Sequence, residues 1–161
     1  MYDLLSIVVA SNHHFEFLSL GPGASDQRSS SPDAEDSRRG EPSRGRVLIV
    51  EDETFAVLYM ADIVTEGGFD VVATAATAEE AIAKAGTENP DLVIMDIRLI
   101  GERDGVYAAT EIMQRHGIRS LFVSAYSDPQ TRHRASVCSP AGFVEKPFTP
   151  ETLLSALRAA L

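Results

Sequence analysis

Cysteine and tryptophan are nearly missing from this sequence. Its 161 residues include one cysteine, Cys138, and no tryptophan. A single cysteine excludes an internal disulfide and a thiolate metal cluster, because each of these needs more than one sulfur atom. We therefore expect a reduced, cytoplasmic protein in which Cys138 is an ordinary thiol.

Basic residues are scarce relative to acidic ones. The chain has 14 lysines and arginines against 24 aspartates and glutamates, which gives a formal net charge of −10 at pH 7. Proteins that bind nucleic acids gather lysine and arginine against the phosphate backbone, so direct nucleic-acid binding is not expected. An acidic chain is better suited to bind metal cations or a basic protein surface.

Long apolar runs are absent as well. No run approaches the roughly 20 residues that a membrane-spanning helix needs. The apolar residues 4–10 follow Asp3 rather than a basic segment, which argues against a secretory signal. We therefore expect no membrane association.

The first 45 residues differ in composition from the rest of the chain. Residues 21–45 are dense in glycine, proline, serine and mixed charges, which predicts a disordered segment or linker. Residues 1–20 are more apolar and are compatible with a short docking segment or with a start codon assigned too early. We predict a weakly structured extension over residues 1–45 and one folded domain over residues 46–161.

From Arg46 onward, short apolar segments alternate with segments of helical periodicity. The predicted strands cover residues 47–50, 69–74, 91–96, 120–124 and 142–144. A helix is predicted after each strand, and the helix at 128–137 has the weakest apolar pattern. Five strands in strict alternation with five helices predict an α/β fold with right-handed βαβ units and a parallel sheet that helices cover on both faces.

Two of the predicted helices have well-defined apolar stripes. The stripe of the first helix consists of Ala56, Tyr59, Met60, Ile63, Val64 and Gly67. The stripe of the last helix, which Thr149 and Pro150 begin, consists of Leu153, Leu154, Leu157 and Leu161. These faces should pack on the sheet.

Polar residues follow the carboxyl ends of the predicted strands, where open α/β sheets bind their ligands. They are Glu51 and Asp52 after the first strand, Asp96 after the third, Ser124 at the end of the fourth and Lys146 after the fifth. Neighbouring carboxylates repel each other unless a cation neutralises them, and hard oxygen ligands suit Mg²⁺. The set predicts phosphoryl transfer to a carboxylate, with Asp96 as the nucleophile.

These motifs carry a resemblance to a known family. Residues 46–161 resemble the receiver domain of bacterial response regulators, in particular the single-domain chemotaxis receivers of two-component signalling. The matching motifs are Glu51-Asp52, Ile94-Met95-Asp96, Asp104-Gly105, Ser124-Ala125 and Lys146-Pro147-Phe148. The resemblance implies a flavodoxin-like fold whose doubly wound sheet has the strand order 2-1-3-4-5.

The resemblance also implies a role for each site residue. Asp96 would accept a phosphoryl group from the histidine of a sensor kinase, and Ser124 and Phe143 would form a conformational switch pair. Mg²⁺ would be bound by Asp52, Asp96 and the backbone carbonyl of Arg98, with Glu51 acting through water. The phosphoryl group would be contacted by Ser124, Lys146 and the backbone N–H of Ala125, and the Lys146–Pro147 peptide bond would be cis.

This sequence departs from the family pattern in the loop after Asp96. The loop is one residue longer than usual, and Ile100-Gly101 stands where a Met-Pro pair is common. Because this loop borders the site, the metal geometry and the lifetime of the phosphoryl group are expected to be affected.

The leading functional interpretation is a stand-alone receiver that is not an enzyme and signals to a downstream effector or phosphotransfer protein. The alternatives are a phosphate sink or phosphorelay intermediate and a degenerate receiver that only dimerises. A phosphatase of related fold is disfavoured, because no acid beside Asp96 could protonate a leaving group. Homodimerisation through the fourth and fifth helices is left open.

Overall fold

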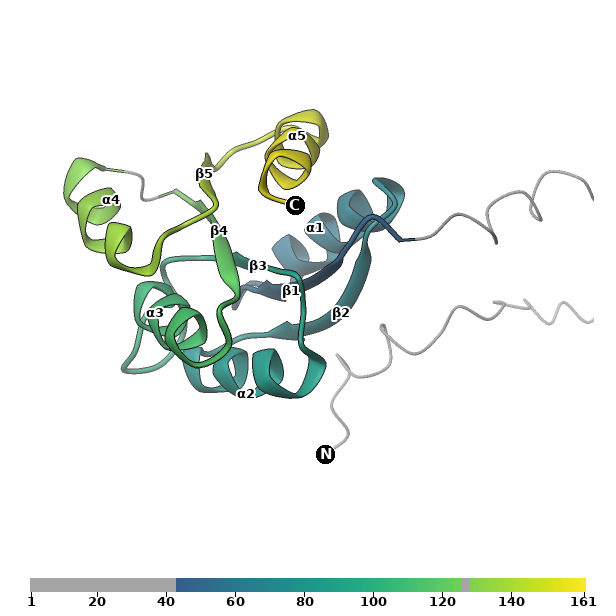
Figure 1. The fold of residues 1–161 in the computed structure, drawn as a ribbon. Coiled ribbons are helices and arrows are strands. Elements are labelled where there is room, and N and C mark those ends of the chain that lie inside the picture. The colour runs from purple at the N-terminus through teal and green to yellow at the C-terminus, as the bar shows by residue number, and fades with distance from the viewer. Residues whose placement is uncertain (1–42, 126–127) are drawn as a thin grey trace, which may run out of the picture. The chain divides into compact units, whose positions relative to one another are not determined.

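The computed structural model describes residues 43–125 and 128–161, and within them five parallel strands alternate with five helices (Figure 1). The strands are β1 (Arg46–Val50), β2 (Asp70–Ala75), β3 (Leu92–Met95), β4 (Arg119–Ser124) and β5 (Gly142–Glu145). The helices are α1 (Thr54–Glu66), α2 (Ala78–Glu88), α3 (Gly105–His116), α4 (Pro129–Ala135) and α5 (Pro150–Ala160). The sheet order is β2-β1-β3-β4-β5, which confirms the predicted fold.

Both faces of the sheet are buried because helices cover each of them. Leu48 and Val50 of β1 point into a core shared with α2 and α3, whereas Val47 and Ile49 point into a core shared with α1 and α5 (Figure 1). These four side chains are fully buried, and burying each contributes about 1.5–3 kcal/mol. This two-sided burial explains why the central strands are apolar runs rather than alternating patterns.

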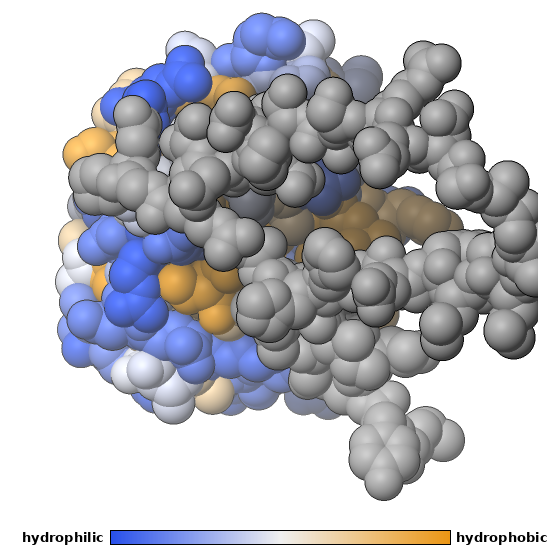
Figure 2. All heavy atoms as spheres, turned by 90° about the vertical axis from the view of Figure 1, so that its right-hand side faces the viewer, coloured by the Kyte–Doolittle hydropathy of each residue, from blue (hydrophilic) through white to orange (hydrophobic). Residues whose placement is uncertain are grey.

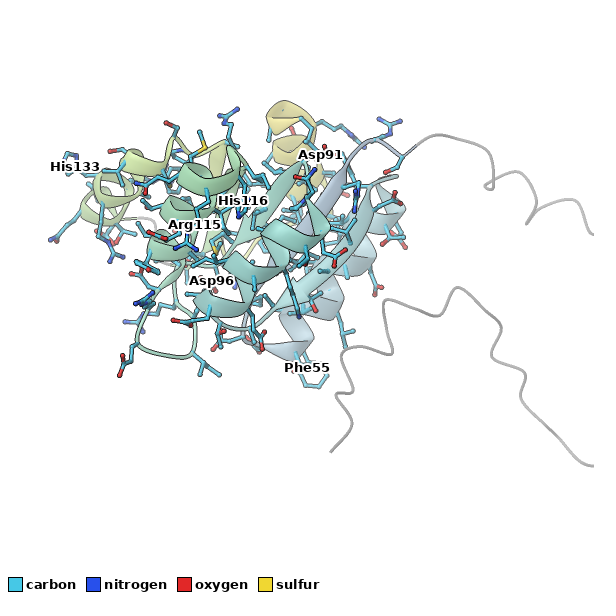
Figure 3. All side chains as sticks on the ribbon, turned by 60° about the horizontal axis from the view of Figure 1, so that its bottom comes forward. Phe55, Asp91, Asp96, Arg115, His116 and His133 are labelled. Carbon is cyan, nitrogen blue, oxygen red and sulfur yellow. The ribbon has the colours of Figure 1, made fainter. Side chains whose placement is uncertain are left out.

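Strand β3 has an aspartate immediately before it and another immediately after it, and Figure 3 shows them at opposite ends of the strand. At one end, the carboxylate of Asp91 accepts a hydrogen bond of 2.8 Å from the backbone N–H of Arg46. At the other end, the backbone N–H of Asp96 donates to the carbonyl of Val50 at 2.9 Å. The bond to Val50 places the Asp96 side chain at the carboxyl end of the sheet.

The predicted stripe of α1 is wrong at Tyr59. This residue is 47% exposed, and its ring stacks on Phe148 with the ring centroids 5.9 Å apart. Val57 is buried in its place, together with Met60, Ile63 and Val64. The sequence pattern accommodated either assignment, because Val57 precedes Met60 by three residues and Val64 by seven, which is also a helical spacing.

The last helix differs from its prediction at Leu161. Leu153 and Leu157 of α5 are buried as expected, but Leu161 follows the helix and is 48% exposed. The N–H of Leu161 still donates to the carbonyl of Leu157 at 3.1 Å and its side chain lies beside Gly45, but at the end of the helix it is only partly covered.

Helix α4 is as weakly apolar as its sequence suggested. Among the residues of α4, only Ala135 is buried. The carboxylate of Asp128 caps the helix by accepting from the backbone N–H groups of Gln130 and Thr131. The hydrogen bond from the Thr131 hydroxyl, together with these backbone bonds, lowers the pKa of Asp128. A short 3-10 turn, η3 (Ser136–Cys138), follows and buries Cys138, whose thiol pKa is raised by burial.

No helix within residues 43–125 and 128–161 is long and apolar enough to span a bilayer. On the face drawn in Figure 2, the coloured side chains are mostly hydrophilic, with orange areas between them.

The described domain begins before the first strand. The backbone N–H of Arg44 donates to the carbonyl of Gly68 at 2.9 Å, and the N–H of Asp70 donates to the carbonyl of Gly45 at 2.9 Å. Residues 44 and 45 therefore continue the backbone pairing between β1 and the start of β2. The sequence had placed them in the weakly structured segment 1–45.

Two truncations should separate the extension from the domain. Deleting residues 1–42 should leave the melting temperature of the domain nearly unchanged, because most of this segment is rich in glycine, proline, serine and charged residues and has little apolar surface to bury. Deleting residues 1–45 should lower it, because the backbone bonds of Arg44 and Gly45 are lost, each worth about 0.5–1.5 kcal/mol. Circular dichroism melts of both forms provide the measurement, and an equal effect of the two deletions would contradict this boundary.

Ser120 offers a substitution that should stabilise the fold. Its hydroxyl in β4 is buried and has no hydrogen-bond partner among the residues that the structure describes. An unsatisfied buried polar group costs about 1–3 kcal/mol, so Ser120→Ala should raise the free energy of unfolding measured with urea. The matched control is Thr77→Ala, which removes the hydroxyl that caps α2 and should cost about 1 kcal/mol. If both substitutions lowered the free energy of unfolding alike, the Ser120 hydroxyl would have a hydrogen-bond partner.

Candidate functional site

A cavity of about 480 Å³ opens at the carboxyl ends of the central strands. It is lined by the residues that the sequence placed there, namely Glu51, Asp52, Asp96, Arg98, Ser124, Ala125 and Lys146. Glu53, Leu99 and Ile100 also line it, and the sequence had not assigned a role to Glu53. The parallel sheet thus brings together side chains that lie as far apart in the chain as Glu51 and Lys146.

Lys146 bridges two of the buried carboxylates. Its ammonium nitrogen Nζ lies 2.5 Å from Oε2 of Glu51 and 2.8 Å from Oδ2 of Asp96. A lysine at the same edge of the sheet as Asp96 is placed to pair with it, so this contact agrees with the sequence, whereas the contact with Glu51 was not expected. Glu51 is 3% exposed and Asp96 is 8% exposed, so the lysine supplies the positive charge that two desolvated carboxylates need.

The pKa values follow from this burial and pairing. Burial, together with the nearby charge of Asp96, raises the pKa of Glu51 by more than the hydrogen bond and charge of Lys146 and the N–H of Glu53 lower it. Burial by itself would lower the pKa of Lys146, but the hydrogen bonds and charges of Asp96 and Glu51 raise it overall. The ammonium therefore keeps its proton at neutral pH.

Both carboxylate oxygens of Asp96 have a defined partner. Oδ2 accepts from Lys146, and Oδ1 accepts from the backbone N–H of Arg98 at 3.2 Å. Together with the backbone bond to Val50, these contacts fix the direction of the carboxylate. A carboxylate held in one orientation needs little reorganisation before it binds a ligand or reacts.

The start of α3 packs directly against the backbone of Asp96. A Cβ atom built on Gly105 would lie 1.8 Å from the carbonyl oxygen of Asp96, so no other residue fits at this position without movement. The N–H of Gly105 also donates to the carbonyl of Ile97 at 2.9 Å, and Asp104 caps the helix through the N–H of Tyr107. The Asp104-Gly105 motif was noticed in the sequence, but this close approach was not visible there.

The residues fit a magnesium ion by their chemistry. Glu51 and Asp96 already share one cation, the Lys146 ammonium, and Asp52 and Arg98 line the same cavity. Within residues 43–125 and 128–161, no group of three or more acidic, histidine or cysteine side chains is drawn close enough to bind a metal. The predicted ligand set stays a prediction.

The residues of the predicted switch pair lie on neighbouring strands. Ser124 is buried at the end of β4, where its carbonyl accepts from the N–H of Lys146 at 3.1 Å. Phe143 of β5 is half-buried, stacks on Phe122 at 5.3 Å and is not among the residues that line the cavity. The Lys146–Pro147 bond is cis, as predicted.

Comparison with known proteins agrees with this geometry. The family profile of the response regulator receiver domain matches residues 47–158. The chemotaxis protein CheY of Bacillus subtilis is 35% identical over 117 residues, which cover 72% of this chain and 97% of CheY. The transcriptional regulatory protein PdtaR of Mycobacterium tuberculosis is 34% identical over 116 residues, but the chain spans only 56% of its length.

The solved structures show the same likeness. One of them is the CheX–CheY–BeF₃–Mg²⁺ complex from Borrelia burgdorferi, which matches with a TM-score of 0.67 and 30% identity over 71% of this chain and 87% of that one. With the fold, the site and the sequence relatives in agreement, the chain belongs to the family of response regulator receiver domains of two-component systems.

Proposed function

We propose that Asp96 accepts a phosphoryl group from the histidine of a sensor kinase in a Mg²⁺-dependent reaction. The observation that carries this proposal is the buried Asp96 carboxylate, which is held by Lys146 on one oxygen and by the N–H of Arg98 on the other. An oriented carboxylate beside a retained positive charge suits nucleophilic attack on phosphorus.

In the proposed reaction, a carboxylate oxygen of Asp96 forms a bond to phosphorus while the bond from phosphorus to the histidine nitrogen breaks. The electron pair of that bond returns to the imidazole. The Ser124 hydroxyl, the N–H of Ala125 and the Lys146 ammonium then bind the phosphoryl oxygens. Asp52, Asp96 and the carbonyl of Arg98 would hold Mg²⁺, with Glu51 acting through water, and the ion would supply further positive charge near those oxygens.

The state of Asp96 would reach a partner through the switch pair. Ser124 would turn toward the phosphoryl group, and Phe143 would move into the space that the hydroxyl leaves. This is supported by their places on adjacent strands, with Phe122 paired to Phe143 and Ser124 paired to Glu145. The readers of this state would be a downstream effector or phosphotransfer protein.

We favour a cytoplasmic switch that passes its state to a partner protein, in keeping with the match to B. subtilis CheY over 97% of that protein. PdtaR, of which the chain spans 56%, is a relative of greater length. A phosphate sink or relay element uses the same chemistry and is distinguished by rapid return of the phosphoryl group to a histidine protein.

Sedimentation of the phosphorylated and unphosphorylated protein would test homodimerisation through α4 and α5.

The proposal is tested by incubating the full chain with acetyl phosphate, with and without Mg²⁺, and measuring intact mass. We expect one acid-labile phosphoryl group that appears only with Mg²⁺ and maps to Asp96. Absence of labelling in the folded protein would favour the degenerate receiver and would point to the longer loop after Asp96.

Lys146→Ala should separate metal binding from the response to the phosphoryl group. The variant should still bind Mg²⁺, because lysine is not a ligand, and the melting temperature should rise more on adding Mg²⁺ than in the wild type. The reason is that Glu51 and Asp96 lose their only described ion-pair partner, a loss that costs about 3–5 kcal/mol for a fully buried pair and less here because Lys146 is 21% exposed. Calorimetric titration and melting curves give the readouts, and loss of Mg²⁺ binding would contradict the assigned role.

A further inference from the structure

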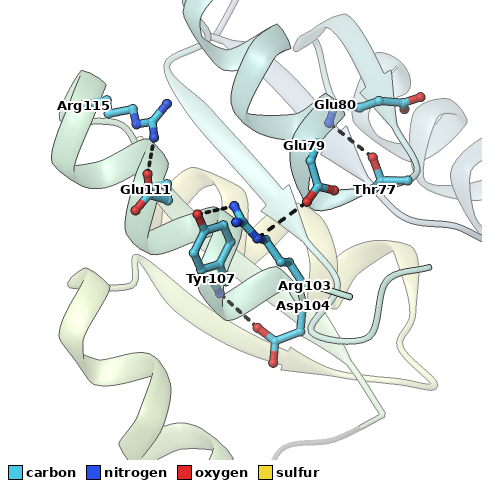
Figure 4. A network of polar contacts seen from close by, with 8 residues as sticks. All are labelled: Thr77, Glu79, Glu80, Arg103, Asp104, Tyr107, Glu111 and Arg115. Carbon is cyan, nitrogen blue, oxygen red and sulfur yellow. Dashed lines mark hydrogen bonds and ion pairs between the residues drawn. The ribbon is translucent and has the colours of Figure 1, made fainter. Parts of the chain in front are cut away.

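An ion pair joins α4 to the beginning of α3. Nη1 of Arg134 lies 2.6 Å from Oδ2 of Asp104. The other oxygen of Asp104 accepts the backbone N–H of Tyr107 at 3.0 Å and so caps α3 (Figure 4). One carboxylate therefore binds two helices at once, one oxygen for each.

Asp104 is also the last residue of the loop that follows Asp96. At its beginning, the loop contacts the phosphoacceptor through the N–H of Arg98, which donates to Oδ1 of Asp96. At its end, Gly105 donates to the carbonyl of Ile97 and packs against the carbonyl of Asp96. A displacement of Asp104 therefore moves a segment that touches Asp96 at both ends.

The loop and α4 face each other across a cavity of about 440 Å³, which is lined by Leu99 from the loop and by Thr131 and Arg134 from α4. Only Ala135 of α4 is buried, and two of the helix's arginines contact other elements: Arg134 pairs with Asp104, and Arg132 lies over the Phe143 ring at 4.8 Å. The Arg134–Asp104 pair thus crosses a space that side chains do not fill. It is a direct link between a weakly packed helix and the phosphoacceptor loop.

We infer that Arg134 is a positioning residue, which through Asp104 couples the placement of α4 to the loop 97–104 and hence to Asp96. The part of this inference that concerns phosphoryl chemistry rests on the proposed function. Coupling is reciprocal, so binding at Asp96 changes α4 by the same free energy by which Arg134 changes binding at Asp96. Helix α4 also contacts the switch pair, because the guanidinium of Arg132 lies over the Phe143 ring at 4.8 Å. The Arg134–Asp104 pair adds a second contact, which runs through the loop 97–104 rather than through β5.

The test compares three full-length variants with the wild type. Arg134→Ala removes the link, and Arg134→Lys restores a cation at the same position. Arg115→Ala is the matched control, because it removes another exposed arginine–carboxylate pair, the 2.5 Å contact with Glu111 on α3 (Figure 4). Arg115 is 57% exposed and Arg134 is 54% exposed, so the two truncations are comparable.

Two readouts are measured: amide hydrogen exchange of the loop 97–104 and of α4, and the affinity for beryllofluoride with Mg²⁺ by calorimetry. Arg134→Ala should speed exchange in both segments and weaken beryllofluoride binding, each by about two- to fivefold, the range that exposed ion pairs support. Arg134→Lys should recover part of each change, and Arg115→Ala should leave the loop, α4 and the affinity as in the wild type.

Faster exchange confined to α4, or equal changes in Arg115→Ala, would overturn the inference, because Arg134 would then only anchor its own helix. If the wild type does not bind beryllofluoride, the proposed function fails, but the exchange measurement still decides the coupling. Faster exchange in both segments would then support it, and faster exchange in α4 alone would overturn it.

Discussion

Asp96→Asn should abolish phosphoryl incorporation from acetyl phosphate while the domain stays folded. The amide lacks the negative charge that makes the carboxylate oxygen a nucleophile, so the bond to phosphorus does not form. Asparagine has nearly the same shape, and Glu51 remains 2.5 Å from Lys146, so the lysine keeps a carboxylate partner. Intact mass after incubation with Mg²⁺ and circular dichroism of the same sample measure the two parts of this expectation.

The matched control is Asp91→Asn at the opposite end of β3 (Figure 3). Asp91 accepts the backbone N–H of Arg46 and lies away from the cavity, so this variant should incorporate the phosphoryl group as the wild type does. Labelling that persists in Asp96→Asn at another residue would show that Asp96 is not the acceptor. Loss of labelling in both variants would point to a general effect of charge at the ends of this strand.

Gly105→Ala should destabilise the domain and impair the site together. The added Cβ would meet the carbonyl oxygen of Asp96 at 1.8 Å, and the atom in its way belongs to the backbone. The N–H of Asp96 is bonded to Val50, so relief requires β3 or the start of α3 to shift. Overpacking costs about 1–3 kcal/mol and occasionally more, and we expect the upper end of this range. The free energy of unfolding measured with urea and the rate of phosphoryl incorporation should both fall.

Gly86→Ala in α2 is the control, because here the same substitution should not lower the stability of the domain. Its new Cβ would meet only the exposed imidazole of His116, at 3.2 Å, and a side chain at the surface can move aside. Alanine is favoured over glycine within a helix by about 1 kcal/mol, so this variant should be as stable as the wild type or more stable. An equal loss of stability in the two variants would show that the contact of Gly105 with Asp96 is not the cause.

The sequence by itself determined the alternation of strands and helices, the parallel sheet and the set of polar residues at its carboxyl edge. These features are local, because a buried strand such as β3 must be apolar throughout and a helix such as α2 needs a capping hydroxyl at Thr77. The order of the strands came from the resemblance to a family rather than from any such pattern. The assignment of Tyr59 failed because Val57, which precedes Met60 by three residues, fits the helical period as well, and the period alone does not decide between the two.

The tertiary structure alone decided which of the polar residues touch. Lys146 meets Asp96 across 50 positions of the chain and Glu51 across 95, and the contact with Glu51 could not be read from spacing. The approach of Gly105 to the carbonyl of Asp96 and the pairing of Arg134 with Asp104 arise in the same way. Local sequence sets the conformation of each segment through capping and burial, whereas these contacts depend on how the helices pack on the finished sheet.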